Sequence, residues 1–163
     1  MNDLTSRALE LQHAAHELMY LGMDGEPVYS DIFCRLNKEV LVKSDSLFSA
    51  QSSDVEEEAN LCLALLMGYN ATIYDDGDKE QKKQMVLNRI CLVLEQLPAS
   101  LLKVRLLTYT YGEVYEEVLF QEAYAIIEGW NKDNLSSEQT EIIEELKNIE
   151  ENPYPFEVVE CKP

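Results

Sequence analysis

A glutamate and a histidine near the N-terminus form the first pattern in the sequence that could do chemistry. Glu10-Leu-Gln-His13 is an E-x-x-H tetrad, and in di-iron helical bundles two such tetrads and two further glutamates surround the metal ions. The second histidine, His16, belongs to no E-x-x-H, and Glu113-Val-Tyr-Glu116 supplies only E-x-x-E. We favour solvated histidines beside an apolar helix stripe, and keep a metal-dependent helical-bundle enzyme as an alternative.

Other catalytic motifs are missing from the sequence. It has no G-x-S-x-G elbow, P-loop or dinucleotide fingerprint. The four cysteines are widely spaced, without the short spacing of a zinc site. Cys62 and Cys91 lie in apolar helical patterns, which suit reduced, buried thiols. We therefore expect a protein that is not an enzyme, with no catalytic residues, no metal site and no cofactor.

Negative charge is the strongest feature of the composition. The 163 residues carry a net charge of −18, and 46% of them are hydrophobic, which argues against disorder. Residues 113–163 hold 14 acids and 3 lysines, so they account for −11 of this charge and the first 112 residues for −7. Direct binding to nucleic acid is disfavoured, because phosphates require clustered lysine and arginine.

Three interpretations of this charge remain open. A basic protein partner is favoured, because opposite electrostatic fields speed association. Acidic residues that only keep the protein in solution explain the charge equally well. An acidic mimic of nucleic acid, which would occupy a basic groove, is a third possibility.

The elements that would position these residues are helices, and one of them is predicted to be central. Residues 53–69 begin with acids and continue through seven consecutive apolar residues, 61–67. Ser53 and Glu56 match a capping box, in which two side chains satisfy free N–H groups at a helix start. A helix that is apolar on every side must be enclosed by helices or lipid, and seven residues fall short of the ~20 that span a membrane.

Apolar periodicity predicts the other helices, over 3–21, 30–49, 79–97, 100–130 and from 136 onward. Gly112 either divides the segment 100–130 or permits close packing. Val114 and Val118 are expected to face the core. Ser136 and Gln139 match a second capping box.

The expected fold is therefore all-α. It is a single-domain bundle of six or seven helices around the buried central helix (about 53–69), covering residues 1–151. Residues 152–163 form an extended tail, packed on this domain or trailing from it, because each proline biases its predecessor away from helix. The polar N-terminus has no apolar signal region, so we expect a cytoplasmic protein that does not enter a membrane.

Four long stretches of the chain carry a resemblance to a known family: YLGMDGEPVYSDIFCRLNKEV (20–40), EEEANLCLALLMGYNATIYD (56–75), LPASLLKVRLLTYTYGEVYEE (97–117) and NPYPFEVVE (152–160). Together they resemble the UpxZ family of transcription antitermination antagonists. The resemblance implies a bacterial regulator of capsular polysaccharide expression that is not an enzyme. Such proteins are encoded beside a NusG-like antitermination factor and antagonise the factors of other loci, so that one capsule operon is transcribed at a time.

For the contact with such a factor we expect acidic steering, followed by burial of an aromatic or apolar patch. Tyrosines beside acids are suited to protein recognition, since they are large and can donate a hydrogen bond. The candidate residues lie in the acidic half of the chain and in the glycine-rich turn after the first helix: Glu113, Glu116, Glu117, Asp24, Glu26 and Tyr29.

Overall fold

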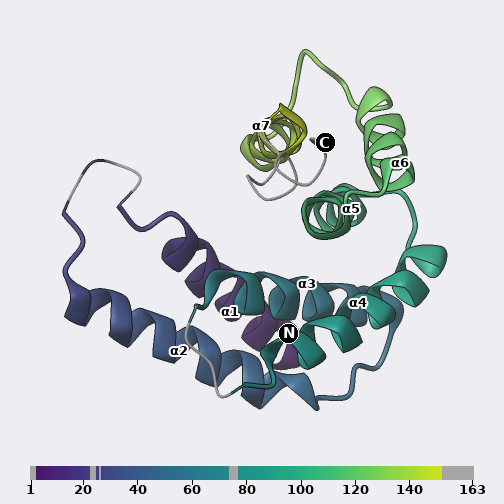
Figure 1. The fold of residues 1–163 in the computed structure, drawn as a ribbon. Helices are drawn as coiled ribbons and strands as arrows, with labels where there is room; N and C mark the ends of the chain where they lie inside the picture. The colour runs from purple at the N-terminus through teal and green to yellow at the C-terminus, as the bar shows by residue number, and fades with distance from the viewer. Residues whose placement is uncertain (1–2, 23–24, 26, 74–76, 152–163) are drawn as a thin grey trace, which may run out of the picture. The chain divides into compact units, whose positions relative to one another are not determined.

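The computed structural model describes residues 3–22, 25, 27–73 and 77–151. In this part of the chain seven helices and no strands are found, which confirms the all-α prediction (Figure 1). The helices are α1 (Asp3–Met19), α2 (Ser30–Phe48), α3 (Val55–Ala71), α4 (Lys79–Gln96), α5 (Leu101–Val114), α6 (Glu117–Glu128) and α7 (Ser137–Glu151).

The chain divides into two compact units, Met1–Leu97 and Pro98–Pro163. The first unit contains α1 to α4 and the second contains α5 to α7. The expected single domain over residues 1–151 therefore stays a prediction, and the expected tail, residues 152–163, lies outside the described residues.

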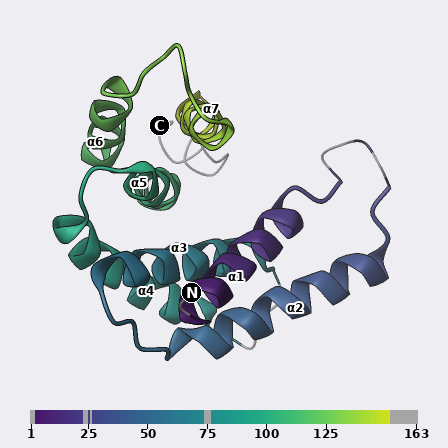
Figure 2. The same ribbon diagram turned by 180° about the vertical axis from the view of Figure 1, so that it is seen from behind.

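Helix α3 is the centre of the first unit, as the sequence predicts. It packs against α1, α2 and α4, and both views of the ribbon show it among them (Figures 1 and 2). Its leucines at 61, 63, 65 and 66 are fully buried, and burying each of them stabilises the fold by roughly 1.5–3 kcal/mol. Within the described residues, none of the helices combines the length and apolar character needed to cross a membrane.

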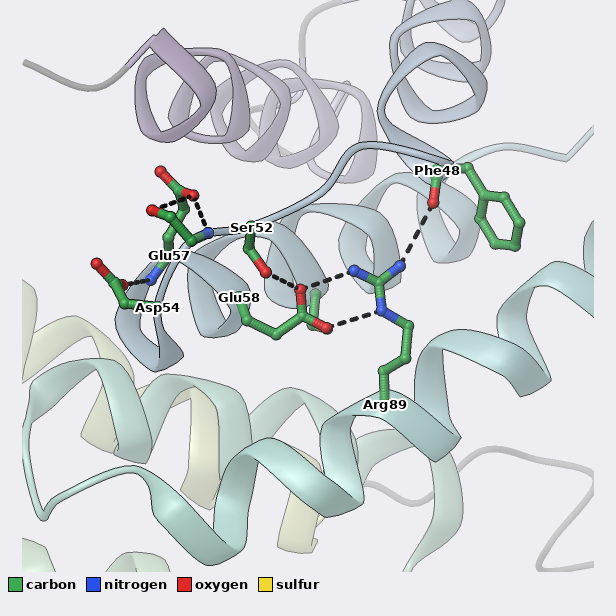
Figure 3. A network of polar contacts seen from close by, with 8 residues as sticks. Phe48, Ser52, Asp54, Glu57, Glu58 and Arg89 are labelled. Atoms are coloured by element: carbon green, nitrogen blue, oxygen red, sulfur yellow. Dashed lines mark hydrogen bonds and ion pairs between the residues drawn. The ribbon is translucent and has the colours of Figure 1, made fainter.

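The start of α3 differs by one residue from the predicted capping box. Asp54, not Ser53, is the N-cap residue, and its carboxylate accepts a hydrogen bond of 2.8 Å from the N–H of Glu57. Glu57 in turn accepts from the N–H of Ser53 at 2.7 Å and from its hydroxyl at 3.1 Å (Figure 3). The box predicted between Ser53 and Glu56 is wrong in register, because the charged oxygen of Asp54 is the stronger acceptor.

A half-buried ion pair joins the start of α3 to the middle of α4 (Figure 3). Arg89 donates from Nε and Nη2 to the two carboxylate oxygens of Glu58, each at 2.8 Å, and from Nη1 to the carbonyl of Phe48 at 3.4 Å. Ser52 donates to Glu58 at 2.6 Å. Burial alone would raise the pKa of Glu58, but the hydrogen bonds from Arg89 and Ser52 and the charge of Arg89 outweigh it, so the pKa is lowered.

The two cysteines that were expected to be buried have different environments. Cys62 is fully buried, and its Sγ lies 3.6 Å from a carboxylate oxygen of Glu58. Burial and the nearby carboxylate raise the pKa of the Cys62 thiol to about 12, so it stays protonated. The prediction for Cys91 is wrong. It is exposed, because Val86, Ile90 and Val93 define the buried face of α4.

In the second unit α5 packs against both α6 and α7. The predicted segment 100–130 is not one helix, because Tyr115 has left-handed backbone angles (φ 54°, ψ 35°) and α6 begins at Glu117. Gly112 lies three residues before this break and permits close packing instead, since a Cβ there would lie 3.3 Å from a methyl carbon of Ile149.

The break also explains why two valines face the solvent. Val114 is the last residue of α5 and is 38% exposed, while Val118 in the first turn of α6 is 62% exposed. The prediction that both face the core is wrong, because it assumed one continuous helical phase through Tyr115.

The capping box predicted at the start of α7 is confirmed. The N–H of Ser136 donates to the side-chain oxygen of Gln139 at 2.8 Å, and the N–H of Gln139 donates to the Ser136 hydroxyl oxygen at 3.1 Å.

Replacing Arg89 by alanine should destabilise the first unit. The substitution leaves the half-buried carboxylate of Glu58 without its charged donor, and losing hydrogen bonds to a charged group of this kind costs about 2 kcal/mol. Urea denaturation followed by circular dichroism measures the change in the free energy of unfolding. Arg35→Ala, at an exposed position on α2, is the control and should change it by less than about 0.5 kcal/mol. Equal effects of the two substitutions would show that the ion pair does not stabilise the fold.

The same ion pair should make the stability of the first unit depend on pH. Because the pKa of Glu58 is lowered in the folded protein, its contribution is present above the ordinary glutamate value of 4.5 and is lost as the pH falls through the lower folded value. Denaturation curves of Glu58→Gln and the parent protein should therefore converge as the pH drops below 4.5. A stability difference that stays constant from pH 7 to pH 3 would contradict this assignment.

Candidate functional site

The three predicted glutamates of the acidic half lie on both sides of the break between α5 and α6. Glu113 is in the last turn of α5 and is half-buried, Glu116 is the exposed N-cap residue of α6, and Glu117 is the exposed first residue of that helix. Residues three and four apart would share one face of a continuous helix. These glutamates do not, because the chain between Glu113 and Glu116 leaves the helix at Tyr115. Their role in binding stays a prediction.

Aromatic side chains form a continuous row across the same break. The ring centroids of Tyr111 and Tyr115 lie 5.3 Å apart, those of Tyr111 and Phe120 also 5.3 Å, and those of Phe120 and Tyr124 4.6 Å. Such spacings are typical of favourable edge and offset ring contacts. Sequence reasoning missed Phe120 and Tyr124, although their spacing of four residues on an apolar helix could have indicated a shared face.

Carboxylates surround this aromatic row. Burial and the charges of Glu117 and Glu150 raise the pKa of Tyr111, and burial and the charges of Glu150 and Glu151 raise the pKa of Tyr124. Tyr111 and Tyr124 therefore remain neutral hydrogen-bond donors beside several negative charges. We call this region the aromatic–acidic surface and define it by these residues: Tyr111, Tyr115, Glu116, Glu117, Val118, Phe120, Tyr124, Glu150 and Glu151.

The aromatic–acidic surface has the chemistry of a protein contact. Aromatic residues are enriched at the centres of protein interfaces, where they become desolvated. Helix α6 adds to this, because eight of its twelve residues are apolar or aromatic, yet only Ala123 and Ile127 are buried.

The second predicted region lies at the turn between α1 and α2. Tyr29 precedes the first residue of α2 and is 60% exposed, and its neighbour Val28 is 44% exposed. Asp24 and Glu26 lie outside the described residues, and their role in binding stays a prediction.

The E-x-x-H residues lie on the outer side of α1. Glu10 and His13 are both exposed and line a shallow groove with Glu17 and Glu39. In the described part of the chain, no group of three or more His, Cys, Asp and Glu side chains is arranged to hold a metal ion.

Comparison with known proteins decides the family. Residues 8–112 match the model of the UpxZ family of transcription anti-terminator antagonists, which is more than half of the chain. The chain belongs to the UpxZ family. It is similar to a transcription anti-terminator antagonist UpxZ from Bacteroides uniformis ATCC 8492, known from a crystal structure. The identity is 68%, the TM-score is 0.85, and the match covers 96% of this chain and 97% of the other. No curated protein matches the sequence.

Membership of the UpxZ family gives the chain its general role, the antagonism of transcription antiterminators. This role is regulatory and implies a partner from the antitermination machinery. The family model ends at residue 112, so it covers the groove on α1 and the turn before α2. Most residues of the aromatic–acidic surface come after residue 112 in the sequence and so lie outside the match.

The left-handed conformation of Tyr115 gives a test of the geometry of the aromatic–acidic surface. In a helix interior glycine is less stable than alanine by roughly 0.5–1 kcal/mol, but at a left-handed residue alanine carries the cost of about 1 kcal/mol that glycine avoids. We expect Tyr115→Gly to be more stable than Tyr115→Ala in thermal and urea denaturation. At Gln121, an exposed position inside α6, the order should be the reverse. If alanine is the more stable residue at both positions, α5 and α6 form one continuous helix.

Proposed function

We propose that this protein inhibits NusG-like antitermination factors of other capsular polysaccharide loci by binding to them, so that one capsule operon is expressed at a time. Its family membership supports this proposal most directly, because the UpxZ family antagonises transcription antiterminators. The choice of NusG-like factors and of capsule loci follows from the sequence resemblance. The protein would act in the cytoplasm, where transcription takes place.

The charge of the chain supports a two-step association. The net charge of −18 would attract a basic factor and raise the rate of encounter, an effect that salt weakens. Tyr115, Val118 and Phe120 would then lose contact with water against the factor. Burial of aromatic and aliphatic side chains supplies most of the affinity in such interfaces, while the surrounding carboxylates contribute to rate and selectivity.

Direct binding to purified antitermination factors tests the proposal. The protein is immobilised, and non-cognate NusG-like factors and the factor of its own locus are passed over it at low salt and at physiological salt. We expect the non-cognate factors to bind, and their association rate to fall as salt increases. If no factor binds at low salt, the protein does not act by direct contact.

Charge reversal tests the contribution of the predicted glutamates. In a variant with Glu113, Glu116 and Glu117 replaced by lysine, association with a non-cognate factor should slow by about tenfold while dissociation changes little. The matched control reverses three exposed glutamates elsewhere in the same unit, Glu128, Glu138 and Glu144, and so changes the net charge equally. If both variants slow association equally, only the total charge matters and the predicted site is wrong.

A further inference from the structure

The first two turns of α2 leave apolar side chains uncovered. None of the residues 30–36 is buried, and Tyr29 and Ile32 are 60% and 39% exposed. Phe33 and Leu36, on the same side of the helix, are only half-buried. Both ribbon views show this end of α2 extending clear of α3 and α4 (Figures 1 and 2). An amphipathic helix normally buries its apolar stripe against the core, whereas these apolar side chains of α2 stay partly or largely exposed in the described part of the chain.

A hollow of about 320 Å³ lies between the end of α1 and the segment Pro27–Val28 that leads into α2. Its walls include Tyr20, Leu21 and Val28, and the ring of Tyr20 is 4.5 Å from that of His16. Gly22 is needed for this shape. Its φ of +85° favours glycine, and a Cβ there would lie 2.6 Å from a methyl carbon of Val28. The hollow has the size and the largely apolar walls to receive one large side chain.

A groove of about 500 Å³ continues from this hollow along α1. Glu17 lines both, so the two are adjacent. The groove has Leu9, which is 39% exposed, among its apolar contacts. Glu10, Glu17 and Glu39 supply three carboxylates to it, against the single ammonium group of Lys43. Its charge is therefore complementary to a basic ligand.

We infer that the α1–α2 groove, formed by Leu9, Glu10, Glu17, Tyr20, Val28 and Glu39, binds a basic segment of a protein partner that carries one large apolar side chain. The exposed Tyr29 follows Val28 directly in the chain and adds apolar surface next to the groove. The apolar side chain enters the hollow beside Tyr20 and Val28, and lysine or arginine side chains pair with the three glutamates. An apolar anchor fixes position and the charges fix orientation, which is the usual division of roles in such contacts. This surface is distinct from the aromatic–acidic surface, which lies in the other unit.

The identity of the partner rests on the proposed function, in which the segment belongs to an antitermination factor. The groove itself does not depend on that function. Two probes therefore separate the two ideas: a purified non-cognate NusG-like factor, and a 15-residue model peptide of lysine and leucine with one tryptophan. A version of the peptide with glutamate in place of lysine controls for charge.

Nuclear magnetic resonance of the isotope-labelled full chain locates the bound peptide. We expect the lysine peptide to shift the amide signals of α1 and of residues 27–36, and the glutamate peptide to leave them unchanged. If the shifts fall on the acidic helix α7 instead, the peptide binds to general negative charge and the inference is wrong. If the protein dimerises through this face in sedimentation experiments, and the peptide does not bind, a second copy covers the groove and the inference is also wrong.

Substitutions in the groove test the same point with the factor. Changing Glu10, Glu17 and Glu39 to glutamine should weaken binding of the factor by about tenfold, and Tyr29→Ala should weaken it by at least about tenfold. The controls change exposed residues of the same unit: Glu56, Glu80 and Glu95 to glutamine, and Leu92 to alanine.

The outcomes distinguish the inference from the proposed function. If the factor binds and the groove variants bind it as tightly as their controls do, the function stands and the groove is not its site. If no factor binds but the lysine peptide maps to the groove, the groove stands and the proposed function fails.

Discussion

Complete enclosure of α3 is the constraint on which the first unit depends. The run from Leu61 to Met67 is apolar on all sides, so α1, α2 and α4 must all reach it. Gly68 shows how closely they do so, since a Cβ there would lie 2.1 Å from the hydroxyl oxygen of Ser44 on α2. Glycine inside a helix costs roughly 0.5–1 kcal/mol relative to alanine, and the close helix contact that it permits offsets this cost. Helix α2 reaches this core with its later turns, since its buried residues begin only at Asn37.

Charged side chains form ion pairs and hydrogen bonds that link both ends of α3 to the neighbouring helices. The Glu58–Arg89 pair satisfies the half-buried start of the helix and ties it to α4. Near the other end, the Tyr69 hydroxyl donates to Asp45 at 2.8 Å, and Lys82 donates to the same oxygen at 3.0 Å. These acids of the first unit therefore have structural roles, and the net charge of −18 overstates how many carboxylates are available to a partner.

Periodicity alone predicted the helices well and the contacts between them poorly. The burial of α3 was predictable, because consecutive apolar residues cover every side of a helix and such a helix must be enclosed by other elements. The ion pair of Glu58 was not predictable, because its partner Arg89 lies 31 residues away and no local pattern joins them. The break at Tyr115 was not predictable in the same way. Tyrosine has no preference for left-handed angles, so its contact with Tyr111 and the packing of α6 on α5 must outweigh the local cost.

The same limits explain why the sequence predicted only some of the residues of each candidate surface. Exposed glutamates and Tyr29 could be selected by residue type, but Val118 and Phe120 belong to a pattern that predicts burial. The exposure of Val118 and the partial exposure of Phe120 follow from geometry: after the left-handed residue α6 packs on α5, and only Ala123 and Ile127 of α6 are buried. At both candidate surfaces, apolar residues typical of a core lie beside negatively charged side chains. A chain that only needed solubility would gain nothing from keeping such residues in contact with water, whereas a chain that binds a basic partner needs both kinds of residue together.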